Sequence, residues 1–262
     1  MTDLDAAGTT SSADFVQSLA RGLAVIRTFD AEHTELSLAE VARRAGIPRA
    51  AARRFLRTLE QLGYVVATPN ARFRLTPRIL ELGYGYLSSL SLPDIVQPHL
   101  DALSHEIGES VSVAVLDGDE IVYVARAAAR RIMSVRITIG TRLPAVATSM
   151  GRVLLAALSD PGQVLDAAEL IAHTSRTRTD RADLIAEIAR VREQGWALVD
   201  GELEEGLRSI AVPLVTRGGV TAALNVSTST ARGDAEGVRN ELLPALQHTA
   251  SLIEAELGAV RG

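Results

Sequence analysis

Residues 37–62 read SLAEVARRAGIPRAAARRFLRTLEQL, and this stretch restricts the possible folds of the chain more than any other. Its apolar residues recur at helical spacing on both sides of a Gly-Ile-Pro turn at residues 46–48, which predicts two short helices joined tightly. Ser37 followed by Glu40 is a capping box for the first helix, and Pro48 suits the first turn of the second. Two amphipathic helices around such a turn are typical of a helix-turn-helix.

The second of these helices carries a row of arginines. Arg49, Arg53 and Arg57 occur at every fourth position, and Arg54 lies beside them. Two explanations are open: a solvated arginine face, or a surface that binds an external anion. No acidic residue precedes Glu60 in this helix, so the arginines lack partners within it. That absence favours the external anion.

A β-hairpin is expected directly after this helix. Residues 64–67 and 72–75 have the composition of strands and flank a Thr-Pro-Asn turn. Alternation along the second strand places Arg72 and Arg74 on one side, opposite two apolar residues. An amphipathic helix over residues 16–30 precedes the helix-turn-helix. Three helices followed by a cationic hairpin predict a winged helix-turn-helix that binds double-stranded DNA.

Charge is unevenly distributed along the chain, whose formal net charge is −5. Residues 15–90 contain 11 arginines and 6 acidic residues, whereas residues 91–262 contain 16 arginines and 23 acidic residues. A locally positive field attracts the phosphates of a nucleic acid even when the whole chain is acidic. The absence of lysine we attribute to genomic composition.

Several classes of function are excluded by composition. The chain has no cysteine, which rules out disulfides, thiolate metal sites and cysteine nucleophiles. No apolar run approaches the roughly 20 residues of a membrane helix, and residues 1–14 lack the apolar core of a secretory signal. The five histidines have no metal-ligand spacing, and no nucleophile elbow or phosphate-binding loop occurs. We therefore expect a cytoplasmic protein with a disordered N-terminal tail, no membrane association, no catalytic or metal site and no cofactor.

The second part of the chain has a different pattern. Residues 111–126 predict two strands around an Asp-Gly turn, and residues 131–138 predict a third strand. Helices are expected at residues 94–107, from Thr148 or Ser149 to Leu158, and at 182–195 and 234–258, with three more strands between the last two. Strands grouped around central helices predict an α+β domain with a mostly antiparallel sheet.

We divide the chain into four parts. Residues 1–14 are expected to be the tail, 15–77 the DNA-binding domain, 78–92 a linker helix and 93–260 the second domain. The acidic run at residues 202–205 has the composition of a catalytic or metal-binding cluster, but we expect it to be a solvated loop.

Several stretches, in the order expected, resemble the IclR family of bacterial transcription regulators between about Phe15 and Leu257. They are SLARGLAVIRTFD, the helix-turn-helix SLAEVARRAGIPRAAARRFLRTLEQLGYV, RFRLTPRILELG, ATSMGRVLLAAL and DGELEEGLRSIAVPL with AALNVST. The stretches RAAARRFLRTLEQLGYV and LGYGYLSSLSLPDIVQPHL resemble more closely the branch that regulates aromatic-acid catabolism through protocatechuate and β-ketoadipate. The resemblance implies a winged helix-turn-helix, a linker helix and a C-terminal GAF-like effector-binding domain. It also implies homodimers, often paired into tetramers, on palindromic operators.

The DNA-contacting residues follow from the geometry of recognition helices. The first turns of such a helix reach base edges, and the residues there are Arg49, Ala50, Ala51 and Arg53. The cations expected to hold phosphates and set the register are Arg54, Arg57, Arg72 and Arg74. The family often has Ser-Thr where this chain has Ala50-Ala51, so we expect apolar contact with bases at that point.

The resemblance places the effector where the start of the helix after Thr148 meets the sheet. Free N–H groups at a helix N-terminus suit a carboxylate, so we expect a small organic acid, aromatic or dicarboxylic. The residues implied on the helix are Ser149, Met150 and Gly151, and those implied on the sheet are Asp200, Ser209, Asn225 and Ser227. Asn225 and Ser227 point to the same face of one strand. Arg136 is a candidate partner for a second carboxylate, with a surface position as the alternative.

Two other classes of function remain as alternatives. One is an enzyme, because GAF-like domains occasionally catalyse reactions. The other is an architectural DNA-binding protein that has no ligand.

Overall fold

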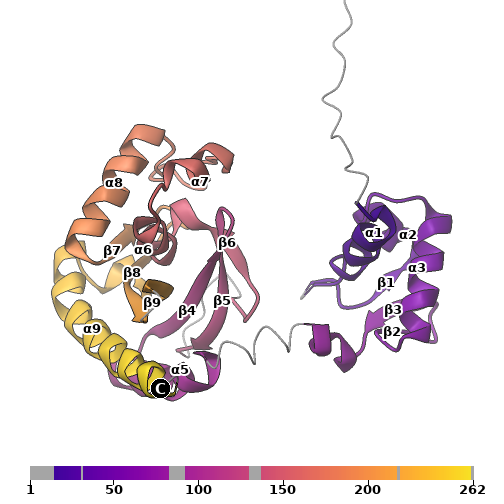
Figure 1. Cartoon of the computed structure of the whole chain (residues 1–262), viewed down its shortest axis with the longest axis horizontal. Helices are drawn as coiled ribbons and strands as arrows, with labels where there is room; N and C mark the ends of the chain where they lie inside the picture. Colours follow the sequence, from indigo (N-terminus) through magenta and orange to yellow (C-terminus); the bar gives the residue numbers. More distant parts are fainter. Residues whose placement is uncertain (1–14, 31, 83–91, 130–136, 217–218, 261–262) are drawn as a thin grey trace, which may run out of the picture. The chain divides into compact units, whose positions relative to one another are not determined.

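The computed structural model describes residues 15–30, 32–82, 92–129, 137–216 and 219–260 of the 262-residue chain. The chain forms two compact units, Met1–Ser89 and Leu90–Gly262 (Figure 1), and each is described by itself. Within the described ranges, no helix combines the length and the apolar character needed to cross a bilayer.

In its described residues, the N-terminal unit contains a group of α-helices and a small antiparallel sheet (Figure 1). The helices are α1 (Gln17–Ile26), α2 (Leu38–Arg44) and α3 (Arg49–Gln61). The strands, in the order β1-β3-β2, are β1 (Leu36–Ser37), β3 (Arg72–Leu75) and β2 (Val65–Ala67). Buried side chains from the three helices and from β1 and β2 form one core. The predicted winged helix-turn-helix is therefore confirmed.

Local sequence explains how α2 starts and ends. The backbone N–H of Ser37 donates to Glu40 Oε2 at 2.7 Å, and the backbone N–H of Glu40 donates to Ser37 Oγ at 3.3 Å. The expected capping box is thus formed. Gly46 has a φ of +63°, in the left-handed region that glycine enters without strain. The backbone N–H of Ile47 then donates to the carbonyl of Ala42, which closes the helix end.

The C-terminal unit is built on one six-stranded antiparallel sheet in the order β6-β5-β4-β9-β8-β7. In that order the strands are Arg142–Pro144, Glu120–Ala127, Ser110–Asp117, Gly219–Ser229, Leu207–Thr216 and Ala197–Asp200. All the pairings between neighbouring strands are antiparallel. This arrangement confirms the predicted α+β class.

Helices cover both faces of this sheet (Figure 1). On one face, α5 (Leu92–Ile107) and α9 (Ala235–Val260) share a core with side chains such as Val111 and Leu224. On the other face, α6 (Ser149–Ala157) and α8 (Arg181–Gln194) share a second core that includes Ala211 and Ala223. The short helix α7 (Gly162–Ala167) contributes Leu165 to that second core. Different helices therefore cover the two faces of the sheet, and the start of α6 lies on the face that α6 and α8 cover.

Two predicted elements, the strand at 131–138 and the linker helix at 78–92, lie mostly outside the described residues. Most of the strand predicted at 131–138 lies outside the described residues, and residues 137–138 are not in a strand. The strand that follows β5 at the sheet edge is the shorter β6, which pairs Leu143 with Ile121. For the linker, Pro77–Leu80 form a 3-10 helix, η1, and residues 83–91 lie outside the described part.

Candidate DNA interface and effector site

The exposed side of α3 carries four arginine side chains. Ala52, Leu56 and Leu59 are buried and hold the opposite side of the helix against the core. The exposed arginines of α3 are Arg49, Arg53, Arg54 and Arg57. Within the described residues, none of these four guanidinium groups forms an ion pair or a hydrogen bond. Such a row fits a polyanion, because no described acidic side chain of the same unit pairs with it.

The two arginines of the wing differ from each other. Arg74 is exposed, and among the described residues it has no ion-pair partner. Arg72 pairs with Glu40 at 3.0 Å and donates to the carbonyl of Glu35 at 2.9 Å. Its guanidinium thus joins β3 to the start of α2. Of the two wing arginines, Arg74 is therefore available to bind phosphate, whereas Arg72 is held by Glu40.

Glu40 takes part in both the capping box and this ion pair. Its pKa is lowered, first by the backbone hydrogen bond from Ser37 and, to a smaller extent, by the charge of Arg72. The negative charge of one side chain thereby stabilises the start of α2 and the position of β3.

The start of α6 is buried against the sheet. Thr148 caps the helix, with its Oγ1 accepting the backbone N–H of Gly151 at 3.1 Å. Ser149 and Met150 are buried, and Ser149 Oγ donates to Ser209 Oγ of β8 at 2.9 Å. A Cβ atom on Gly151 would lie 2.1 Å from the carbonyl oxygen of Ala145, so only glycine fits this close approach.

A group of polar side chains lies on the sheet face that α6 covers. Cross-strand register aligns Ser110 with Ser227 and Ser227 with Ser209. In the next row on the same face, Ser112 is aligned with Asn225. We name this group the polar strip; it consists of Ser110, Ser112, Ser209, Asn225 and Ser227. Of the residues predicted for the effector site, the structure brings Ser149, Ser209, Asn225 and Ser227 together here.

Asn225 lies in the middle of the polar strip with an unsatisfied acceptor. Its side chain is 2% exposed, and Nδ2 donates to Ser227 Oγ at 3.0 Å. The Oδ1 atom is buried and has no hydrogen-bond partner among the residues that the structure describes. An unpaired buried amide oxygen is unfavourable by about 1–3 kcal/mol, and few such groups occur in native proteins. The atom is therefore suited to accept a hydrogen bond from a molecule that the chain does not supply.

Asp200 does not join this group. In β7, Val199 is aligned with Ser209, so its neighbour Asp200 points to the opposite face. There the carboxylate pairs with Arg208 at 3.0 Å and with Arg176 at 3.3 Å. Arg136, the other charged candidate, lies outside the described residues.

Arg126 of β5 is a residue that the sequence did not nominate. It is aligned with Ser112, and its guanidinium donates to Ser112 Oγ at 3.3 Å and to Ser110 Oγ at 3.4 Å. A register shift between Val113 and Ala114 aligns Tyr123 with Ala114, so Arg126 and Tyr123 face the same side although they are three positions apart in the chain. Strict alternation would place them on opposite sides, which hides this arginine from a sequence pattern.

Burial changes the ionisation of both side chains. Desolvation lowers the pKa of Arg126 and raises that of Tyr123 to about 12, so near neutral pH the tyrosine is neutral and the arginine is still charged. Within the described residues, Arg126 has no carboxylate partner. The guanidinium of Arg126 therefore lies beside the polar strip as a partly desolvated cation that no described carboxylate neutralises.

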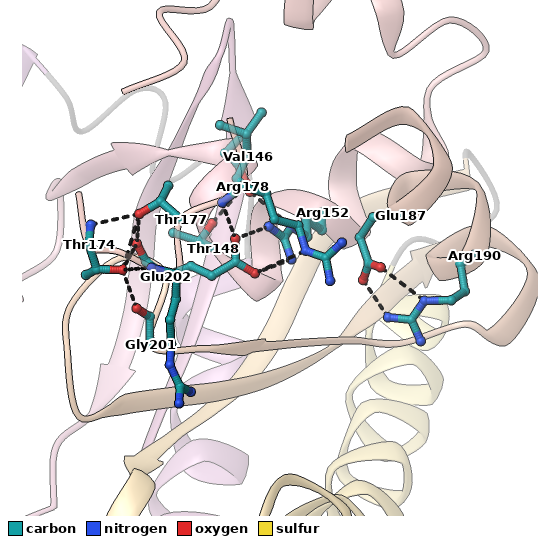
Figure 2. A network of polar contacts seen from close by, with 12 residues as sticks. Val146, Thr148, Arg152, Thr174, Thr177, Arg178, Glu187, Arg190, Gly201 and Glu202 are labelled. Atoms are coloured by element: carbon teal, nitrogen blue, oxygen red, sulfur yellow. Dashed lines mark hydrogen bonds and ion pairs between the residues drawn. The ribbon is translucent and has the colours of Figure 1, made fainter. Parts of the chain in front are cut away.

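The position of α6 is fixed by a buried network shown in Figure 2. Arg152 is 1% exposed and donates to both carboxylate oxygens of Glu202, at 2.8 and 2.6 Å, and to the carbonyl of Val146 at 3.0 Å. Glu202 also accepts the backbone N–H of Arg178 at 3.0 Å, and its own carbonyl accepts Thr177 Oγ1 at 2.6 Å. The network links α6 to the segment before α8 and to the β7–β8 connection.

This network corrects one expectation from the sequence. The run at residues 202–205 was predicted to be a solvated loop, but Glu202 is buried. The reason is the guanidinium of Arg152, which is buried in the first turns of α6 and needs a counterion there. Among the described residues, no cluster of three or more histidine, aspartate or glutamate side chains is arranged to hold a metal ion.

Comparison with known proteins agrees with this architecture. Residues 18–69 match the IclR helix-turn-helix domain, and residues 84–255 match the bacterial transcriptional regulator IclR C-terminal domain. The chain is 49% identical over 242 residues to the Pca regulon regulatory protein of Pseudomonas putida, covering 90% of this chain and 82% of the relative. It is 37% identical over 246 residues to the p-hydroxybenzoate hydroxylase transcriptional activator of Acinetobacter baylyi, covering 91% and 90%.

Solved structures give the same result. A putative transcriptional regulator from Rhodococcus sp. RHA1 is 55% identical, with a TM-score of 0.82, over 94% of this chain and 100% of the other. An IclR homolog from Microbacterium hydrocarbonoxydans in complex with 4-hydroxybenzoate is 27% identical, with a TM-score of 0.82, over 92% and 98%. The expected resemblance to regulators of aromatic-acid catabolism is thereby confirmed. The chain belongs to the IclR family of bacterial transcriptional regulators, with the family's helix-turn-helix domain and C-terminal domain both present.

Proposed function

We propose that this regulator binds a palindromic operator and that a small organic acid, held between the start of α6 and the polar strip, controls that binding. The observation that carries the proposal is the Oδ1 atom of Asn225, which is buried in the middle of the polar strip and lacks a hydrogen-bond partner within the described part of the chain. Ser149, Met150 and Gly151 form the helix side of the site, and Ser209 and Ser227 line its sheet side. The names of two relatives, one of them solved with 4-hydroxybenzoate, support an aromatic acid as the effector.

The roles on DNA follow from position on α3 and the wing. The residues proposed to meet base edges are Arg49, Ala50, Ala51 and Arg53, in the first turns of α3. The cations proposed to hold phosphates are Arg54, Arg57 and Arg74, which are exposed and unpaired within the described residues. We leave Arg72 out of this set because Glu40 already holds it.

A second copy of the chain is the proposed partner of α1. Phe15, Leu19 and Leu23 recur at every fourth residue and are 56%, 63% and 49% exposed. An exposed apolar stripe of this kind is unfavourable in water and is covered when two copies of one helix pack together. A two-fold dimer presents two recognition helices to two half-sites. Following the family resemblance, we propose that such dimers also pair into tetramers.

We propose no catalytic role and no cofactor. Apart from Arg126, the described side chains at the effector site are uncharged: serines, Asn225, Met150 and the neighbouring Tyr123, whose pKa burial raises to about 12. None of these described groups is a general base near neutral pH. A regulator that acts on chromosomal DNA works in the cytoplasm, and this is the location we propose.

A binding titration tests the proposal. A labelled duplex from the regulator's own promoter region is titrated with protein at fixed salt, with and without 4-hydroxybenzoate or 3,4-dihydroxybenzoate. Calorimetry establishes separately that the acid binds. We expect the operator affinity to change when the acid is bound. Identical isotherms in the presence of a bound acid would contradict control by the effector, whereas failure of every acid to bind would contradict the site itself.

A further inference from the structure

We infer that Arg126, with Ser110 and Ser112, binds the carboxylate of the effector, and that Asn225 receives a hydrogen bond from the opposite end of the same molecule. This inference rests on the proposed function, because it assigns the chemistry within the proposed effector site. It names a class of ligand: an aromatic monocarboxylic acid that carries a hydroxyl group away from the carboxylate.

Several hydrogen-bond donors surround the guanidinium of Arg126. Within the described residues, its guanidinium donates two long hydrogen bonds, at 3.3 and 3.4 Å, both to neutral serine hydroxyls. A planar guanidinium is shaped for a two-point contact with a carboxylate. The hydroxyls of Ser110 and Ser112 lie beside it and are able to donate to the same carboxylate. Three donor groups thus converge at one end of the polar strip.

Among the described strand residues that face α6, Arg126 is the one charged side chain. Its positive charge is partly desolvated, which lowers its pKa, and no carboxylate of the described chain compensates it. Removing a charge from water without a partner is unfavourable. A carboxylate ligand would supply the missing counterion.

Arg126 and Asn225 lie in the same cross-strand row, each aligned with Ser112 between them. Neighbouring strands are about 4.8 Å apart, so their Cα atoms are separated by about 10 Å. Both side chains project from the sheet face that α6 covers, so one molecule lying along this row would meet the guanidinium at one end and Oδ1 at the other. Asn225 Oδ1 accepts a hydrogen bond but repels a second carboxylate, and this favours a hydroxyl at that end.

This assignment differs from the hypothesis drawn from the sequence, in which the start of α6 binds the carboxylate. The backbone N–H of Gly151, one of the free donors that such a helix start would offer, is already satisfied by Thr148 Oγ1. Ser149 Oγ is likewise engaged with Ser209 Oγ. The ligand therefore meets uncharged groups on the α6 side of the site, and Arg126 of β5 supplies the positive charge that binds its carboxylate.

Calorimetry on the full-length protein tests the inference. The probes are 4-hydroxybenzoate, 3,4-dihydroxybenzoate and benzoate, each compared with its uncharged amide. The variants are Arg126→Met, which keeps the length of the side chain and removes the charge, and Arg126→Lys, which keeps the charge. The matched control is Arg142→Met on the neighbouring strand β6, where the arginine already pairs with Asp117 and Glu120.

We expect Arg126→Met to weaken the tightest-binding acid by about 10- to 100-fold, the range for a lost hydrogen bond to a charged group. The ratio of the affinity for the acid to the affinity for its amide should fall to near one in Arg126→Met. Arg126→Lys should keep part of the wild-type ratio. Arg142→Met should bind like the wild type. Without ligand, the melting temperature of Arg126→Met should be unchanged or higher, because an uncompensated charge has been removed.

Two results would overturn the inference. One is an Arg126→Met variant that binds the acid as tightly as the wild type does. The other is an equal loss of affinity for acid and amide together with a lower melting temperature, which would mark Arg126 as structural. Both leave the proposed function standing. If the wild type binds none of the three acids, the proposed function fails instead.

Discussion

Arg152 on α6 and Glu202 on the β7–β8 connection form a buried two-point ion pair, with both N···O distances below 3 Å. The pair connects the helix that carries Ser149 with a connection about 50 residues later in the chain. Breaking one partner of such a pair leaves a buried charge, which destabilises a protein by about 3–5 kcal/mol. The pair therefore holds the helix side of the effector site in place.

Glu202→Gln should lower the free energy of unfolding of the C-terminal unit by about 3–5 kcal/mol, because Arg152 remains charged and buried. Urea titration followed by the fluorescence of Trp196, the single tryptophan, measures this unit. Glu205→Gln in the same connection is the control, since Glu205 is exposed and should change stability by less than about 0.5 kcal/mol. Equal stability of the two variants would show that the Arg152–Glu202 ion pair does not contribute to the stability of this unit.

Gly151→Ala should destabilise the fold and abolish acid binding, because the added Cβ would meet the carbonyl oxygen of Ala145 at 2.1 Å. The matched control is Gly258→Ala in α9, where a Cβ meets no atom within 4 Å. That control should be neutral or stabilising by up to about 1 kcal/mol, the difference in helix propensity. Thermal melting and calorimetry measure both properties, and a Gly151→Ala variant that behaves like the control would show that the start of α6 is not tightly packed.

Arg53→Ala should weaken operator binding by about 1–3 kcal/mol and relax the preference at one base pair, because its side chain is proposed to read a base edge. Arg74→Ala should instead weaken binding to all sequences and reduce the salt dependence by about one phosphate contact. Titrations against an operator library at several salt concentrations separate the two. Loss of affinity without any change in base preference for Arg53→Ala would place this arginine on a phosphate.

Acidification should weaken the N-terminal unit through Glu40. Its pKa lies below the ordinary value of 4.5, chiefly because of the backbone hydrogen bond from Ser37. A depressed pKa means that the stabilisation is fully present above the unfolded value and is lost as the pH falls through the folded value. The difference in melting temperature between wild type and Glu40→Gln should therefore be largest near pH 6 and shrink below pH 4.5. A difference that is constant with pH would exclude a role for the charge.

Local signals in the sequence predicted much of this fold. The capping box at Ser37, the turn at Gly46 and the hairpin turn at Asp117-Gly118 depend on residues a few positions apart. Gly195 ends α8 with a φ of +79°, as its place after an amphipathic run predicts. The polar residues Asn225 and Ser227 were found because one strand places them on one face.

The remaining features depend on contacts between distant segments. Asp200 was assigned to the effector site, yet its carboxylate lies on the other face with Arg208. Arg126 was missed because a register shift in the β4–β5 hairpin changes which side it faces. Glu202 was expected in water because no local pattern links it to Arg152. Each of these outcomes is set by strand register or by a buried partner, which a single sequence does not specify.

On the proposed function, one acid bound at the polar strip changes the affinity of α3 for operator DNA. Fluorescence anisotropy of a labelled operator duplex, at fixed salt, tests it with wild type and with Asn225→Leu, each with and without saturating 4-hydroxybenzoate. The account predicts that the acid changes the operator affinity of the wild type by about 5-fold or more. It predicts that Asn225→Leu keeps the affinity measured without acid and loses the response. Superimposable wild-type isotherms with the acid bound, or a full response in Asn225→Leu, would contradict the account.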